Sequence, residues 1–359
     1  MADATCMGCG CVCDDIELTA DGPVRTCPLG DRWFAERTGA RPPIASVEGR
    51  EVSLDEAADA AAAILREARA PLVYGLGQTS CEAQRRAVAL ADACGAVIDV
   101  GAATEAYAAI GSSTATLGEI RDRAELVVIW RADPVVTHPR LLERLRLDPS
   151  KLLVVDSERT ATAAAAGAFV EIADDFETLW ALRGGEAGAL GDRLDGARHV
   201  AFIHGPLDEL TTLALLSLVR DVARDRHAVT LGLRADGNAR GAEDVLAWQT
   251  GFAAPVDFAR GFPRPAQRAA ELLERGEVDA ALVVGALENL PRDLPTVVVD
   301  ARATATAEAA RVAFATAADG IEVPGTVHRM DGVPLPLRAP LAAERPSVED
   351  VLATITDRL

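Results

Sequence analysis

Short apolar runs, separated by helix-like segments, recur along almost the whole chain and constrain its fold more than any other feature. They lack polar alternation, and they are ELVVIW (125–130), KLLVVD (151–156), RHVAFIH (198–204), HAVTLGL (227–233), DAALVVG (279–285) and PTVVVD (295–300). Strands without polar alternation are typical of a parallel sheet that is covered by helices on both faces. The sequence therefore predicts an α/β protein with doubly wound architecture.

Helix signals fit between these strands. Ser53-Leu54-Asp55-Glu56 has the pattern of a capping box and opens an Ala-rich helix that Pro71 should end. PLVYGLG (71–77) predicts a strand that closes in a Gly turn, and Ser80 should start a helix through Cys94. A strand at AVIDV (96–100) and a helix at 209–222 complete the pattern.

One internal similarity predicts two related lobes. VVDSERTATAAAA begins at Val154 and VVDARATATAEAA begins at Val298, so each places an Asp, Asp156 or Asp300, at the end of a strand. Chance similarity in a chain so rich in Ala is the alternative. Ligands of such folds bind beyond the carboxyl ends of the strands, so both Asp turns belong to the expected ligand side.

Length and charge limit the classes of function. At 359 residues the chain suits two domains, and 49% hydrophobic with 25% charged residues is a globular balance. A formal charge of −19 argues against nucleic acid and against anionic membrane surfaces. With neither an apolar run of about 20 residues nor a signal-peptide pattern at the N-terminus, we expect a cytoplasmic protein.

Five of the seven cysteines fall within residues 6–27 and form the strongest chemical signal. The four thiolates of a [4Fe–4S] cluster could come from Cys6, Cys9, Cys13 and Cys27. Gly8 and Gly10 would allow the backbone to wrap closely around such a cluster. Cys11 would then be a spare thiol. A structural zinc site with four Cys ligands is the alternative, although such sites more often pair two C-x2-C halves.

Other reactive residue types have simpler explanations. Cys81 and Cys94 lie one helix length apart and are expected in the core, and His138 is expected to satisfy backbone groups. The sequence contains neither a Ser/His/Asp nor an HxH metal constellation that would give this chain hydrolase activity of its own.

The cysteine head CMGCGCVCDDIEL resembles that of the B subunit of formylmethanofuran dehydrogenases, a molybdopterin-type subunit. Further similar blocks span most of the chain. They are GLGQTSCEAQRRAVALADACGAVID (75–99), LGEIRDRAELVVIW (117–130), HPRLL (138–142), WQTGFAAPVDFARGFPRP (248–265), GEVDAALVVGA (276–286) and GTVHRMDGVPLPL (325–337). In that family a tungsten- or molybdenum-pterin reduces carbon dioxide to formate, and a zinc amidohydrolase subunit condenses the formate with methanofuran.

The resemblance implies a molybdopterin-oxidoreductase-like fold without the final β-barrel domain. Residues 1–50 would form a Cys-rich head. One lobe would combine 51–104 with 236–340, residues 105–235 would form an inserted lobe, and 341–359 would be a C-terminal helix. His328 with Arg329 is similar to a family loop near the cofactor, although a contact with cofactor is not expected here.

The sequence departs from the family at three cofactor positions. Glu105 occupies the place of the metal-binding Cys, which exchanges a soft ligand for a hard one. In Arg234–Gly241 the family's His and Tyr are missing, and the acidic Asp236 stands where pterin phosphates need donors. Arg131 replaces a small Gly. Together these changes predict that molybdopterin or tungstopterin is absent.

This combination resembles the bacterial formyltransferase/hydrolase complex, in which a formyl group passes to a methanofuran-type carrier and is released as formate. The B subunit would be a scaffold without redox activity that could retain an iron–sulfur cluster. Its partners would be a zinc amidohydrolase-type A subunit, a C subunit and a formyltransferase-type D subunit. Two alternatives are an active molybdenum or tungsten dehydrogenase subunit with Glu105 as metal ligand and a stand-alone zinc-stabilised binding module.

Overall fold

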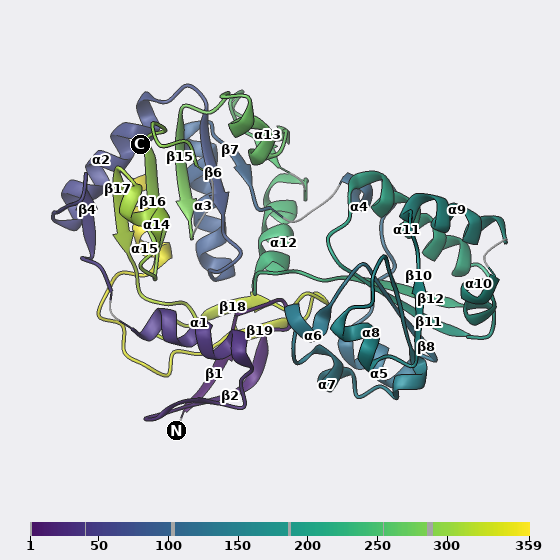
Figure 1. Ribbon diagram of the computed structural model, residues 1–359. Helices are drawn as coiled ribbons and strands as arrows, with labels where there is room; N and C mark the ends of the chain where they lie inside the picture. The colour runs from purple at the N-terminus through teal and green to yellow at the C-terminus, as the bar shows by residue number, and fades with distance from the viewer. Residues whose placement is uncertain (1, 40, 102–104, 186–187, 254, 286–289) are drawn as a thin grey trace.

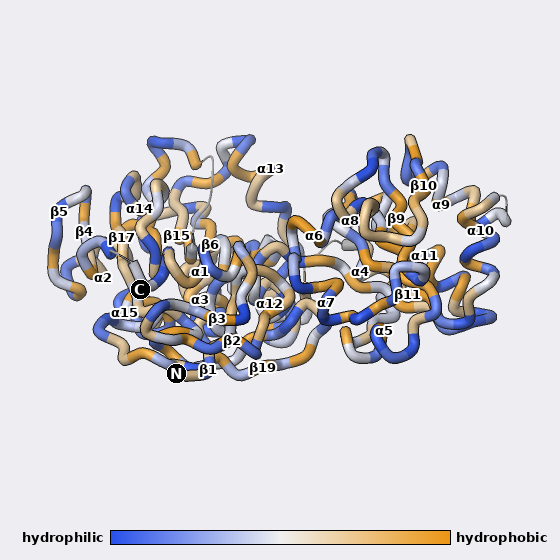
Figure 2. The backbone as a smooth tube through the Cα atoms, turned by 60° about the horizontal axis from the view of Figure 1, so that its bottom comes forward, coloured by the Kyte–Doolittle hydropathy of each residue, from blue (hydrophilic) through white to orange (hydrophobic). Residues whose placement is uncertain are grey.

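The computed structural model describes residues 2–39, 41–101, 105–185, 188–253, 255–285 and 290–359, without the side chain of Glu105. Two lobes, each built on its own sheet, lie beside one another above a small head that contains the N-terminus (Figure 1). Figure 2 shows the same separation of the lobes from another direction.

The smaller lobe contains a five-stranded sheet in the order β10-β9-β8-β11-β12, with every neighbouring pair parallel. Its strands are β8 (Leu126–Trp130), β9 (Leu152–Asp156), β10 (Ala168–Glu171), β11 (His199–His204) and β12 (His227–Gly232). Its helices are α4 (Glu105–Ile110), α5 (Leu117–Arg123), α6 (Pro134–Thr137), α7 (Leu141–Leu145), α8 (Ala161–Ala165), α9 (Asp175–Gly184), α10 (Gly188–Asp195) and α11 (Glu209–Val222). A 3-10 turn covers Pro149–Lys151.

Helices cover both faces of this sheet, as predicted. Val127 and Ile129 of β8 share a core with residues of α5, α7 and α8, whereas Val128 and Trp130 pack with residues of α9, α10 and α11. Successive side chains of a strand point to opposite faces, so a strand buried on both sides reads as a continuous apolar run.

The larger lobe contains a nine-stranded sheet in the order β14-β13-β7-β6-β15-β16-β17-β4-β5. Its strands are β4 (Ala45–Val47), β5 (Arg50–Glu51), β6 (Pro71–Gly75), β7 (Val97–Asp99), β13 (Val256–Asp257), β14 (Arg264–Pro265), β15 (Ala280–Val284), β16 (Thr296–Asp300) and β17 (Val312–Ala315). Its helices are α2 (Leu54–Glu67), α3 (Cys81–Cys94), α12 (Ala239–Thr250), α13 (Ala269–Glu274), α14 (Ala305–Ala309) and α15 (Val348–Thr356).

The prediction of a parallel sheet is confirmed for the centre of this lobe and is wrong at its edges. The strands from β7 to β17 are parallel, but β13, β14, β4 and β5 are antiparallel additions of two or three residues. Runs this short carry no hydrophobic periodicity, so no pattern in the sequence marks them.

Three further strands and a helix form the head, and a hairpin packs beside it. These elements are β1 (Ala2–Cys6), β2 (Cys13–Thr19), β3 (Gly22–Val24), α1 (Pro28–Thr38), β18 (Gly325–His328) and β19 (Pro334–Leu337). Buried residues of the head, among them Ile16 and Phe34, belong to the same hydrophobic cluster as Leu141 and Leu145 of α7. The head therefore shares its core with the smaller lobe.

Local capping explains several helix starts. Ser80 accepts a hydrogen bond from the backbone N–H of Ala83, as expected for an N-cap. The capping box predicted at Ser53 is only half formed: Ser53 accepts from the N–H of Glu56, but the Glu56 carboxylate binds Arg50 at 3.0 Å. Helix α2 ends at Glu67, and Pro71 opens β6 instead of ending the helix.

Among the described residues, we find no helix whose length and apolarity would allow it to cross a bilayer.

Candidate functional site

The head brings the four predicted cysteine ligands to one end of a hairpin. Cys6 ends β1 and is the register partner of Cys13 at the start of β2, so the loop that carries Cys9 begins and ends at this pair. Cys27 is the N-cap of α1. Cys6, Cys9 and Cys13 are buried and Cys27 is half-buried.

The electrostatics of these thiols show that they are close enough to influence one another. Burial raises the pKa of Cys6 far above its usual range, and negative charge on Cys13, Cys9 and Cys27 raises it further. Burial also raises the pKa of Cys13, against the opposing effect of Arg144 and Arg140. Thiolates at these positions would therefore need a positive partner, either the two guanidinium groups or a metal.

In the part of the chain that the structure describes, no group of three or more His, Cys, Asp or Glu side chains is placed as the ligands of a metal ion would be. Ligation of a metal or cluster by Cys6, Cys9, Cys13 and Cys27 stays a prediction from the sequence.

Cys11, the predicted spare thiol, lies beside Cys9. A hydrogen bond between the two side chains lowers the pKa of Cys9 and raises that of Cys11. Cys11 is fully buried.

The cysteine loop is docked onto a segment far along the chain. The N–H of Gly10 donates to the carbonyl of Arg234 at 2.9 Å, and the carbonyl of Gly10 accepts from the N–H of Met330 at 3.0 Å. A Cβ atom at position 10 would lie only 2.7 Å from the Arg234 carbonyl oxygen. Gly10 is thus required for the approach of this loop to the Arg234 backbone.

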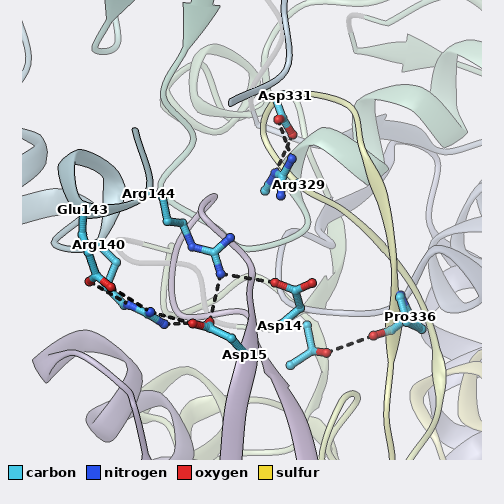
Figure 3. Close-up of polar contacts among 9 residues, drawn as sticks. Asp14, Asp15, Arg140, Glu143, Arg144, Arg329, Asp331 and Pro336 are labelled. Atoms are coloured by element: carbon cyan, nitrogen blue, oxygen red, sulfur yellow. Dashed lines mark hydrogen bonds and ion pairs between the residues drawn. The ribbon is translucent and has the colours of Figure 1, made fainter. Parts of the chain in front are cut away.

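Ion pairs join the head to the smaller lobe (Figure 3). Arg140 binds both carboxylate oxygens of Asp15, at 2.8 and 2.7 Å, and Arg144 contacts Asp14 at 3.2 Å and Asp15 at 3.0 Å. Burial alone would raise the pKa of Asp15, but the bond from Arg140 and the charges of both arginines lower it overall. In the same view Arg329 binds Asp331 through two hydrogen bonds of 2.7 Å.

Three positions depart from the family pattern, and the structure describes the side chains of two of them. The backbone of Glu105 begins α4, but its side chain lies outside the described residues.

Arg131 follows β8 with a backbone φ of 48°, a conformation that glycine adopts more readily. Its guanidinium contacts Asp156 at 3.2 Å and Asp175 at 2.9 Å. The strand-end Asp156, expected on the ligand side, is thus bound by a side chain of the protein itself.

Asp236 lies directly on the Gly turn after β6. A Cβ atom at Gly77 would be 2.6 Å from the Asp236 carboxylate, and Oδ1 of Asp236 accepts a hydrogen bond of 2.9 Å from Gln78. Glycine turns at strand ends bind phosphate through backbone N–H groups. Here a carboxylate covers the turn, so an anionic ligand would meet a charge of its own sign, and the site fits a pterin phosphate poorly.

A buried polar network continues from this segment. Arg234 pairs with Glu243 at 2.7 Å, and the hydroxyl of Tyr107 lies 2.7 Å from Nε2 of His204. Burial lowers the pKa of His204 to about 4, which keeps its ring neutral. Tyr107, His204 and Glu243 were not expected from the sequence, because no local motif marks them.

The remaining candidates have structural contacts. His138 donates from Nε2 to the carbonyl of Arg234 at 2.8 Å, so it satisfies a backbone group as predicted. His328 binds Asp244 through Nδ1 at 2.8 Å. Cys81 is buried as predicted, whereas Cys94 is only half-buried.

Three proteins of known role are similar to this chain in sequence, although no protein-family model matches it. The B subunit of the tungsten-containing formylmethanofuran dehydrogenase 2 of Methanocaldococcus jannaschii is 30% identical over 404 residues, covering 94% of this chain and 92% of that protein. The corresponding subunit of Methanococcus maripaludis is 27% identical, with coverage of 97% and 95%. The B subunit of the formyltransferase/hydrolase complex Fhc of Methylorubrum extorquens is 29% identical, with coverage of 87% and 97%.

A solved structure agrees with these similarities. The X-ray structure of the formyltransferase/hydrolase complex FhcABCD from Methylorubrum extorquens, in complex with methylofuran, contains a chain that matches with a TM-score of 0.72 and 25% identity. The match covers 88% of this chain and 98% of that one. Sequence and fold together show that this chain belongs to the family of formylmethanofuran dehydrogenase B subunits.

Proposed function

We propose that this chain is the B subunit of a formyltransferase/hydrolase complex and serves there as a scaffold without redox activity. The complex would transfer a formyl group to a methanofuran-type carrier and release it as formate, in tetrahydromethanopterin-linked one-carbon metabolism. The partners would be the A, C and D subunits, and the compartment would be the cytoplasm.

The observation that carries this proposal is the contact of Asp236 with the Gly77 turn. A pterin cofactor is bound through anionic phosphates, and a carboxylate with a hydrogen bond to Gln78 opposes them at the strand end where they would lie. The ion pairs of Arg131 with Asp156 and Asp175 support the same conclusion in the other lobe.

The scaffold role is supported by the way the chain connects its parts. The Arg234 segment holds the cysteine loop through Gly10, while Arg140 and Arg144 hold the head to the smaller lobe. We propose a division into a head (1–50), a discontinuous lobe (51–104 with 236–340), an inserted lobe (105–235) and a C-terminal helix (341–359). Within this division, β4 and β5 pair with the sheet of the discontinuous lobe and the C-terminal helix packs in its core.

We further propose that Cys6, Cys9, Cys13 and Cys27 would hold a [4Fe–4S] cluster. Two observations support this proposal. Cys6, Cys9 and Cys13 are buried, and negative charge on Cys9, Cys13 and Cys27 raises the pKa of Cys6. A bound cluster would supply four covalent links across the head, and electron transfer only if a redox partner were present. A brown complex that absorbs at about 400 nm would support the cluster, and a colourless one would contradict it.

A second candidate is an active tungsten- or molybdenum-pterin dehydrogenase subunit with Glu105 as metal ligand. The similarity to subunits whose complexes are named as tungsten-containing favours it. The poor fit of the Gly77 turn to an anion weighs against it.

Purification of the native complex separates the two candidates. We expect the chain to co-purify with A, C and D subunits, to contain less than about one tenth of an equivalent of Mo or W, and to release formate from the formylated carrier. Stoichiometric metal with pterin would overturn the scaffold proposal. Isolation of the chain without partners would overturn both candidates and favour the stand-alone zinc-stabilised module.

A further inference from the structure

Helix α9 lies at the end of the smaller lobe that points away from the larger lobe (Figure 1). Leu179 is its only buried residue. Phe176 and Trp180 are 48% and 62% exposed and stack on each other, with ring centroids 6.1 Å apart and an angle of 14° between the ring planes. Two large aromatic side chains are thus held in order at the surface without contributing to the core of this chain.

A groove runs along the same helix. It encloses about 470 Å³ between α9, α10 and the edge strand β10, and its apolar lining includes Val170, Ala181 and Leu190. Glu177, which lines the groove, is one residue after Phe176 and three before Trp180, so the aromatic pair lies on the adjacent stripe of the helix. Groove and aromatic pair therefore form one continuous face, which we call the α9 face.

The charges around the α9 face are acidic. Asp174 and Glu177 line the groove, and both are exposed. The nearby Arg183 is neutralised by Asp221 at 2.7 Å and lies over the Trp180 ring at 5.3 Å. A partner that covers this face would gain from Lys or Arg side chains around an apolar centre.

We propose that the α9 face docks another subunit of the complex, through an apolar segment flanked by basic side chains. This inference rests on the proposed function, which supplies partner subunits. Exposed aromatic residues beside an apolar groove are the usual centre of a protein interface, and Trp is the residue most often dominant there. A second copy of this chain fits less well, because its charge of −19 would repel the acidic rim.

The chain offers a matched control for a test. Trp248 in α12 of the larger lobe is 70% exposed and lies 5.4 Å from the Arg85 guanidinium, so it resembles Trp180 in exposure and in its Arg contact. It lies outside the α9 face. Trp180→Ser and Trp248→Ser should therefore have equal effects on the isolated chain and different effects on assembly.

The experiment co-expresses each full-length variant with tagged A, C and D subunits and measures the dissociation constant of this chain from the purified complex. We expect Trp180→Ser to weaken binding at least tenfold and Trp248→Ser to change it less than twofold. Glu177→Lys, which reverses a charge at the rim without removing apolar surface, should weaken binding severalfold and keep the same thermal midpoint as the wild type.

The outcomes separate this inference from the proposed function. If wild-type chain and both Trp variants assemble equally well, or if both variants lose binding equally, the α9 face is not the docking site, although the proposed function stands. If wild-type chain does not assemble with the A, C and D subunits at all, the proposed function itself is wrong. If Trp180→Ser unfolds the isolated chain, Glu177→Lys decides alone, and unchanged binding of that variant overturns the inference.

Discussion

Five parallel strands have the same spatial arrangement in the two lobes but different chemistry at their strand ends. In the smaller lobe β10-β9-β8-β11-β12 follow one another, and in the larger lobe β17-β16-β15-β6-β7 take the same places. In each, the strand ending in Asp156 or Asp300 leads to a short helix capped by Thr160 or Thr304. The internal similarity in the sequence thus corresponds to a repeated structural unit.

Arg131 and Gly285 occupy equivalent positions in this repeat. The N–H of Arg131 donates to Val155 at 3.0 Å, and that of Gly285 donates to Val299 at 2.9 Å. Both residues have positive φ, 48° and 105°. Gly285 borders a cavity of about 20 Å³, room for about one water molecule, whereas the side chain of Arg131 turns to the carboxylates of its own lobe. The same backbone turn therefore carries an ion-pairing side chain in the smaller lobe and no side chain in the larger one.

Gly205→Ala tests how tightly the strand ends of the smaller lobe are packed. A Cβ atom at position 205 would overlap the carbonyl oxygen of Arg131, a backbone atom that has little freedom to move. We expect a loss of about 3 kcal/mol in the free energy of unfolding, measured by urea denaturation. Gly285→Ala is the control: among the described residues no atom lies within 4 Å of its added Cβ, so the expected cost, about 1 kcal/mol, comes from its φ of 105°. Equal losses would show that overlap with the Arg131 carbonyl oxygen is not the cause of the destabilisation.

His204 should make the smaller lobe sensitive to acid. Its pKa is lowered by burial to about 4, so the unfolded chain binds a proton more readily than the folded chain. Stability should be constant above about pH 6.5 and fall by about 1.4 kcal/mol per pH unit as the pH drops towards 4. Burial also lowers the pKa of His138, which acts in the same direction.

The measurement is urea denaturation between pH 7 and 5, with His204→Gln beside the wild type. In the variant, the slope of the unfolding free energy against pH should decrease by the equivalent of about one bound proton. An unchanged slope in His204→Gln would show that other groups cause the sensitivity.

Cys9→Ser and Cys13→Ser test whether the head that joins the lobes is structural. We expect the yield of assembled complex to fall severalfold while formate release per assembled complex stays within about twofold, because the thiols anchor the loop that docks on Arg234. Cys94→Ser, in α3, is the control. Lower turnover with intact assembly would indicate electron transfer through the head.

Arg131→Gly would make the two strand ends chemically alike. The variant loses the ion pairs with Asp156 and Asp175, but glycine adopts the positive φ at this position without strain. We therefore expect the free energy of unfolding, measured by thermal or urea denaturation, to fall by about 1 kcal/mol. Metal analysis of the complex should still find no gain of Mo or W, since Asp236 continues to cover the Gly77 turn. Uptake of metal would show that Arg131 alone excludes the cofactor.

Glu105→Ala should have the smallest effect. A scaffold has no metal for this carboxylate to bind, so formate release by the complex should remain within about twofold of the wild type. A loss of ten times or more would support the dehydrogenase alternative, in which Glu105 is a ligand. Glu119→Ala, on the surface of α5, is a suitable control for the loss of one negative charge.

The α/β class, the central strands and the long helices could be predicted from the order of residues alone, because these depend on apolar runs and caps within a few residues of one another. Helix α11 spans Glu209–Val222 and helix α3 ends at Cys94, both as predicted. The departures at Arg131 and Asp236 were also visible, as residue types that do not suit a pterin site.

What those residues contact became clear only from the folded chain. Asp236 reaches Gln78 across 158 positions of the chain, and Tyr107 reaches His204 across 97. The two-residue edge strands and the docking of Gly10 on Arg234 are also long-range pairings. Contacts of this kind arise when separate elements pack, and local periodicity carries no information about which distant partners will meet.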